Sequence, residues 1–143
     1  MNFEHWQERA MSYAIGNYEI KAVIDHYFPN CGITGKIFKE WGPGEVSFAD
    51  IKTRTIFIPD GIKKWSDRGA LEWVILHECA HIHYKDNQIR NITIEKRADA
   101  FAACIQHTTE FGVKALKKFE KFDKFNLKEI QERINALKAL TLR

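Results

Sequence analysis

The strongest constraint on this chain is a His-Glu-x-x-His signature inside an apolar run that extends from Trp73 to His81. On a helix, at 100° per residue, His77 and His81 lie about 40° apart, so both imidazoles project from one face. Two neutral imidazole nitrogens on one face can bind a single zinc ion at roughly 2.0–2.1 Å each. Glu78 lies about 60° around the helix from His81, near enough to hold a metal-bound water. The motif therefore predicts a metal site on a helix, with Glu78 as its acid-base group.

The alternative is a buried helix whose two histidines form ordinary hydrogen bonds in the core. The residues that flank the motif are largely apolar, so two histidines on one face would be costly to bury without a shared partner. A glutamate at the right angle between them, and a second acidic stretch downstream, favour the metal site over this alternative.

The downstream stretch, residues 93–102, predicts a second helix that carries Glu95 and Asp99 on one stripe. Alanines beside this stripe would let the helix approach the first one closely. A catalytic zinc needs three protein ligands, and His77, His81 and Glu95 would supply that number for one ion. Asp99 could accept the second N–H of His77 or His81 and fix its tautomer. The alternative is a solvated charged face that pairs with neighbouring lysine and arginine side chains.

Hydrophobic periodicity predicts a single α+β domain over residues 1–143. Residues 1–30 should form N-terminal helices over 4–13 and 18–28, and residues 34–59 a small antiparallel meander with strands over 36–41, 45–49 and 53–58. One of these strands should be an edge that could pair with an extended peptide, although a strand that only packs on the helices is an equal alternative. Two helices over 66–109, the first capped by Ser66 or Asp67 and the second by Thr93, should pack on this meander.

The C-terminal part, residues 110–143, predicts two amphipathic helices, the last opened by a capping box at Asn126. This part carries the excess positive charge of the chain. It could be a lid, an inhibitory segment or a docking surface for an acidic partner. Ordinary helices that complete the core are the preferred interpretation.

Composition excludes several classes of protein. A hydrophobic content of 45% with 13% aromatic residues favours a folded globule over a disordered chain. Apolar runs fall far short of the ~18 residues that a membrane span needs, and the first residues lack the pattern of a signal peptide. The cysteines show no Cys-x-x-Cys spacing, so we expect reduced thiols in a cytoplasmic protein. A net charge of +3 without nucleic-acid motifs gives no reason to expect a nucleic-acid partner.

The His-Glu-x-x-His motif and the acidic stretch downstream of it together resemble a known pattern. HECAH, from His77 to His81, followed by EKRAD, from Glu95 to Asp99, looks like the HExxH plus Glu-x-x-Ala-Asp pattern of gluzincin metallopeptidases. The pattern is similar to the catalytic core of the CAAX-prenyl proteases and HtpX-like proteases, and especially to their compact soluble relatives, the minigluzincins. ImmA/IrrE-type peptidases, which often carry Ala-Asn at the positions of Ala98 and Asp99, are a near alternative.

The similarity of motif covers residues 77–102, with weaker support over 34–109. The chain departs from the pattern in one respect, since only 13 residues separate His81 from Glu95 and leave little room to elaborate a cleft. The resemblance implies a zincin-like fold in which one zinc ion is bound by His77, His81 and Glu95. It also implies that Glu78 is the general base and acid, and that Asp99 orients a metal-binding histidine without binding the metal itself.

We therefore expect a zinc-dependent endopeptidase that hydrolyses a peptide or protein substrate through a metal-activated water. The alternative is a non-catalytic or latent zinc-binding regulatory protein whose cleft is covered by the C-terminal helices. Substrate and oligomeric state stay open at this point. The group that stabilises the oxyanion is also open, with four weak candidates: Tyr13, His26, Tyr84 and His107.

Overall fold

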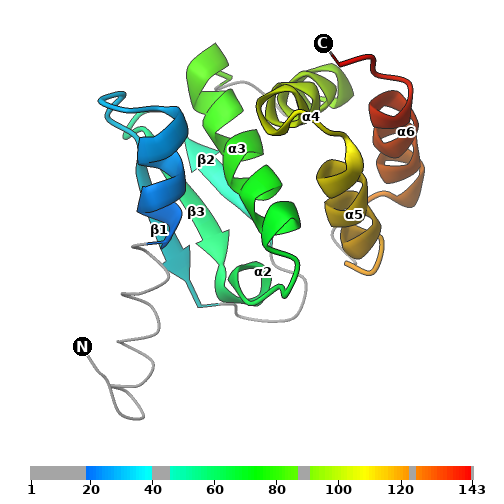
Figure 1. The fold of residues 1–143 in the computed structure, drawn as a ribbon. Coiled ribbons are helices and arrows are strands. Elements are labelled where there is room, and N and C mark those ends of the chain that lie inside the picture. Colours follow the sequence, from blue (N-terminus) through cyan, green and yellow to red (C-terminus); the bar gives the residue numbers. More distant parts are fainter. Residues whose placement is uncertain (1–18, 40–45, 87–90, 123–124, 143) are drawn as a thin grey trace.

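The computed structural model describes residues 19–39, 46–86, 91–122 and 125–142. Its elements in chain order are a helix over 19–27, β1 (Thr34–Phe38), β2 (Phe48–Asp50), β3 (Thr55–Pro59), α2 (Asp60–Lys63), α3 (Arg68–Tyr84), α4 (Ile92–Gln106), α5 (Glu110–Phe119) and α6 (Leu127–Lys138). Helices with one small sheet make this an α+β fold, as predicted (Figure 1). The predicted helix over 4–13 lies outside the described residues.

The sheet is mixed, so the predicted antiparallel meander is wrong. Its strand order is β1-β3-β2, with β1 parallel and β2 antiparallel to the central β3. The reason lies in the strand sequences. The central strand, TIFIP, buries four of its five residues, whereas β1 and β2 carry polar residues and are partly exposed. The most apolar strand therefore takes the central position, where it is paired on both sides. Within the described residues, β2 lies at an edge of the sheet.

The helix over 19–27 and α3 both pack on the sheet, and Figure 1 shows them in front of its strands. Contact between this first helix and β1 depends on Gly35. A Cβ atom at this position would lie 2.2 Å from Cγ2 of Ile20 and 3.1 Å from Cδ1 of Ile24. The missing side chain of Gly35 thus lets the helix approach the strand closely.

Helix α3 lies between the sheet and the C-terminal helices (Figure 1). Of the two predicted caps, Asp67 is the one used, and its side chain accepts a hydrogen bond from the Ala70 amide at 3.0 Å. The helix ends at Lys85, which adopts a left-handed conformation with φ 58°. Most of its residues are buried, because it contacts other elements on several sides. His77 and Glu78 are therefore held by a helix that is packed on several sides.

Helix α4 starts two residues earlier than its predicted cap would allow. Asn91, not Thr93, is the N-cap, and its side chain accepts a hydrogen bond from the Ile94 amide at 3.0 Å. Asparagine and threonine are both good N-caps. Asn91 is the residue with an extended backbone at the start of the helix, whereas Thr93 already lies within the helix. The helix ends at Gln106, three residues before the predicted end at 109, and its C-cap His107 adopts a left-handed conformation with φ 59°.

The C-terminal helices belong to the same hydrophobic core as α3, which agrees with the preferred interpretation of them. Gly112 lets α5 approach α3, since a Cβ atom there would lie 2.5 Å from Nε1 of Trp73. Helix α6 is capped by Asn126, as predicted, and buries Ile130, Ile134 and Leu137. Among the described helices, none is long and apolar enough to span a membrane.

Candidate metal centre

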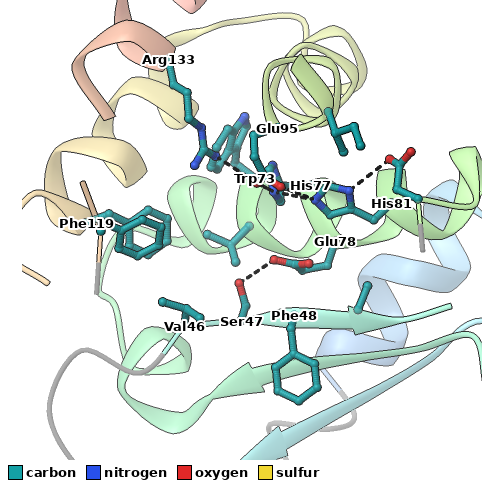
Figure 2. Close-up of a pocket in the computed structure, with 15 residues that line it drawn as sticks. Val46, Ser47, Phe48, Trp73, His77, Glu78, His81, Glu95, Phe119 and Arg133 are labelled. Atoms are coloured by element: carbon teal, nitrogen blue, oxygen red, sulfur yellow. Dashed lines mark hydrogen bonds and ion pairs between the residues drawn. The ribbon is translucent and has the colours of Figure 1, made fainter. Parts of the chain in front are cut away.

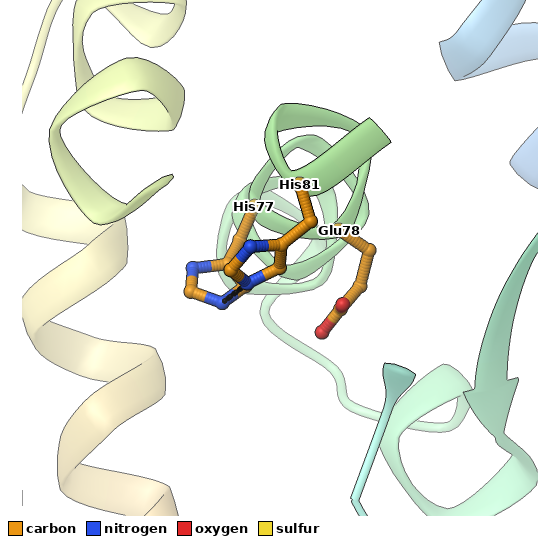
Figure 3. Close-up of side chains that lie close together, drawn as sticks. All are labelled: His77, Glu78 and His81. Atoms are coloured by element: carbon orange, nitrogen blue, oxygen red, sulfur yellow. Dashed lines mark hydrogen bonds between the residues drawn. The ribbon is translucent and has the colours of Figure 1, made fainter. Parts of the chain in front are cut away.

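Three side chains from α3 and α4 converge on one point. Nε2 of His77 lies 3.1 Å from Nε2 of His81 and 3.1 Å from Oε1 of Glu95, and Nε2 of His81 lies 3.4 Å from Oε2 of Glu95. The two imidazole rings are nearly perpendicular, at 86° (Figure 3). The spacing of four residues along α3 and the close packing of α4 thus bring together side chains from two separate stretches of sequence.

The other ring nitrogen of His77 faces a buried acid. Nδ1 of His77 lies 2.9 Å from Oδ1 of Asp99, one turn beyond Glu95 on α4. Asp99 in turn accepts two hydrogen bonds from Arg133 of α6, from Nε at 2.8 Å and from Nη2 at 2.7 Å. Burial acts to raise the pKa of Asp99, but the charge and hydrogen bonds of Arg133, together with His77, outweigh it and lower the pKa below its usual value. Asp99 is therefore ionised, which is the form that can accept a hydrogen bond from the His77 ring.

His81 has a similar arrangement with a different acid. Its Nδ1 lies 3.2 Å from Oδ2 of Asp86, the second residue after α3 ends. The left-handed turn at Lys85 directs the chain back, so that the Asp86 amide donates to the carbonyl of His81 at 2.9 Å. Nη2 of Arg97 on α4 donates to the other carboxylate oxygen of Asp86, and the Arg97 guanidinium lies 4.0 Å from the ring centroid of Tyr84.

A carboxylate oxygen lies near Nδ1 of each histidine, at 2.9 Å for His77 and 3.2 Å for His81. A proton on each Nδ1 would leave the two Nε2 lone pairs available to a metal ion beside Glu95. In that form the two imidazoles and the Glu95 carboxylate could together bind a cation. Burial opposes a charged ring, but Asp99 and Glu95 overcome this and raise the pKa of His77 to about 10. The field at this point thus favours positive charge.

Glu78 lies beside the histidines. Each of the three side chains His77, Glu78 and His81 is buried and offers an atom within 4.8 Å of the others, and the group could hold a metal ion. Figure 3 shows the Glu78 carboxylate to one side of the two rings. Its Oε2 accepts a hydrogen bond from the hydroxyl of Ser47, at 2.7 Å, just before β2 (Figure 2).

A cavity of about 270 Å³ opens onto this group. One side is formed by residues 46–49 at the edge of the sheet, and another by Trp73 and Val74 of α3. Phe119 and Arg133 of the C-terminal helices complete the wall (Figure 2). An apolar cavity of about 150 Å³ holds a benzene molecule, so this volume leaves room for a side chain next to a metal ion and a water.

The weak oxyanion candidates do not line this cavity in the described part of the chain. Tyr84 packs against Phe101, His107 ends α4, and His26 is exposed on the first helix. Tyr13 lies outside the described residues. His83 points away from the other two histidines and packs against Phe101, as the helical angle predicts.

Three residues near the metal centre were not predicted from the sequence: Ser47, Asp86 and Arg133. Arg133 left a signal, because it interrupts the apolar stripe of the last helix between Ile130 and Ile134, where a charged residue needs a buried partner. Asp86 and Ser47 lie in polar connections and left none. Only the folded structure brings them to the histidines.

Comparison of the chain with protein families, with curated proteins and with solved structures yields no match.

Proposed function

We propose that this chain is a zinc-dependent peptidase of the gluzincin type, in which His77, His81 and Glu95 bind one zinc ion. The observation that carries the proposal is the convergence of two Nε2 atoms and one carboxylate at 3.1–3.4 Å from one another. Ligands about 2.0–2.1 Å from a tetrahedral zinc lie roughly 3.3 Å apart. The spacing between the three groups thus fits three corners of a zinc tetrahedron.

The donor set also supports zinc. Two neutral imidazoles and one carboxylate, with the fourth position open, form a common ligand set of catalytic zinc. The carboxylates behind His77 and His81 are the partners that zinc-binding histidines usually have. When bound, the zinc would supply Lewis acidity, which lowers the pKa of a water toward about 7 and polarises a carbonyl. The resemblance of the HECAH and EKRAD stretches to gluzincins supports the same assignment.

Glu78 is the proposed general base. It would take a proton from the attacking water and deliver that proton to the amine that leaves when the peptide bond breaks. The substrate would lie along the edge of β2, where unpaired backbone groups can bond to an extended chain. One of its side chains would enter the cavity between Trp73 and Phe119. Peptide or protein is thus the proposed substrate class.

The alternative function, a regulatory protein with a non-catalytic zinc, gives Glu78 no role. A closed structural site uses all four positions for ligands and has no use for a carboxylate that lines an open cavity. The two functions make different predictions for this one residue.

The test is cleavage of fluorescein-labelled casein by the zinc-loaded protein and by Glu78→Gln. The substitution keeps the shape of the side chain and removes the base. We expect Glu78→Gln to keep its zinc and lose cleavage, while Glu72→Gln, on the same helix but outside the cavity lining, keeps both. Equal cleavage by the wild type and a zinc-loaded Glu78→Gln variant would exclude the proposed mechanism. A zinc-loaded wild type that cleaves nothing would favour the regulatory alternative.

A further inference from the structure

The Glu78 carboxylate differs from the other acids near the site. Glu95, Asp99 and Asp86 each face a histidine or an arginine. Glu78 is 5% exposed, and within the described residues it forms no ion pair with a lysine or arginine. The hydrogen bond that it accepts comes from the hydroxyl of Ser47, at 2.7 Å. This single donor thus has an unusually large share in deciding how the carboxylate is oriented.

We infer that Ser47 is a positioning residue for Glu78, an assignment that rests on the proposed peptidase function. The hydroxyl binds Oε2 and so restricts rotation of the carboxylate, which leaves Oε1 as the oxygen that accepts the proton. A general base has to lie within hydrogen-bond reach of the proton that it removes. A carboxylate that rotates freely would spend part of its time in orientations that cannot do so.

Ser47 also lies next to β2, the strand along which the substrate would bind. It directly precedes β2, and residues 46–49 line the cavity together with Glu78. Figure 2 shows the Ser47 side chain directed to Glu78, while that of the next residue, Phe48, points the opposite way. This alternation is the ordinary period of an extended chain. The same short segment would therefore orient the peptide and the base that acts on it.

A matched pair of variants tests this inference. Threonine and valine have nearly the same shape, and both suit an extended segment, but only threonine carries a hydroxyl. We expect Ser47→Val to lower kcat on fluorescein-labelled casein about 10- to 100-fold, the range for loss of one hydrogen bond to a charged group. KM and zinc content should be unchanged. Ser47→Thr should retain a kcat close to that of the wild type.

The outcomes separate this inference from the proposed function. Equal kcat values for the valine and threonine variants would overturn the role of Ser47, and so would a loss confined to KM or to zinc content. A valine variant faster than the wild type would also overturn it, because Ser47 would then restrain the base. If the zinc-loaded wild type itself cleaves nothing, the proposed function fails and the role of Ser47 fails with it.

Discussion

The two histidines of the candidate metal centre are held by two carboxylate–arginine pairs that differ in burial. Asp99 and Arg133, behind His77, are each 2% exposed, and two hydrogen bonds join them. Behind His81, the Asp86 side chain is 7% exposed, but its partner Arg97 is 46% exposed and donates through one nitrogen. The chemistry is the same and the surroundings differ. If Arg97 is removed, water can solvate the Asp86 carboxylate in its place. If Arg133 is removed, water has little access to the Asp99 carboxylate.

The largest expected effect comes from removal of the buried arginine. Arg133→Met would leave the buried Asp99 carboxylate with His77 as its remaining cationic partner, and the loss of one partner from a buried ion pair typically costs about 3–5 kcal/mol in the free energy of unfolding. Urea denaturation of the zinc-free protein measures this loss. A cost below about 1 kcal/mol would mean that water reaches Asp99 and that the two pairs are equivalent.

A double variant separates stability from metal binding at the same pair. Asp99→Leu combined with Arg133→Met replaces both charges by apolar groups, which is often neutral for stability. We expect the double variant to recover most of the unfolding free energy that Arg133→Met loses, and to keep the weakened zinc binding of a His77 without its acceptor. Recovery of zinc affinity together with stability would show that Asp99 acts only through the fold.

A smaller effect is expected at the more exposed acid. Loss of a carboxylate partner typically weakens metal binding about 10- to 100-fold. We expect Asp86→Asn to fall at the lower end of this range and Asp99→Asn at the upper end, because the buried carboxylate contacts its histidine more closely, at 2.9 Å against 3.2 Å. Competition with a chromophoric chelator measures both affinities. The reverse order would contradict the comparison.

The smallest effect is expected at Arg97. An exposed ion pair contributes about 0–1 kcal/mol, and the contact with Tyr84 adds about 0.5–1 kcal/mol. Arg97→Met should therefore cost no more than about 2 kcal/mol in unfolding free energy and leave zinc affinity nearly unchanged. Loss of zinc binding on the scale of Asp86→Asn would show that Arg97 fixes the acid as firmly as Arg133 does.

The sequence predicted the parts of this molecule that depend on local spacing. Helix α3 and the placement of two histidines on one face follow from a periodicity of 3.6 residues, and Asp67 is one of the two caps that were predicted for this helix. The proximity of Glu95 and Asp99 to those histidines required one further assumption, that α4 packs closely on α3. The short connection of 13 residues and the alanines of α4 made this arrangement favourable.

What could not be predicted depends on contacts between distant segments. Arg133 reaches Asp99 only because α6 packs against α4, 34 residues later in the chain. Ser47 reaches Glu78 because β2 lies at the edge of the sheet next to α3. The strand order itself was missed because neighbouring strands in sequence were assumed to pair in turn, whereas the burial of β3 places it between the other two.

The most direct test of the central claim is the zinc content of the purified protein, measured by plasma mass spectrometry for the wild type, Glu95→Ala and His83→Ala. The variant at His83 is a matched control, since this histidine is on the same helix but packs against Phe101. The account predicts near-stoichiometric zinc in the wild type and in His83→Ala, and little or none in Glu95→Ala. Full zinc content in Glu95→Ala, or no zinc in a wild type supplied with it, would contradict the account.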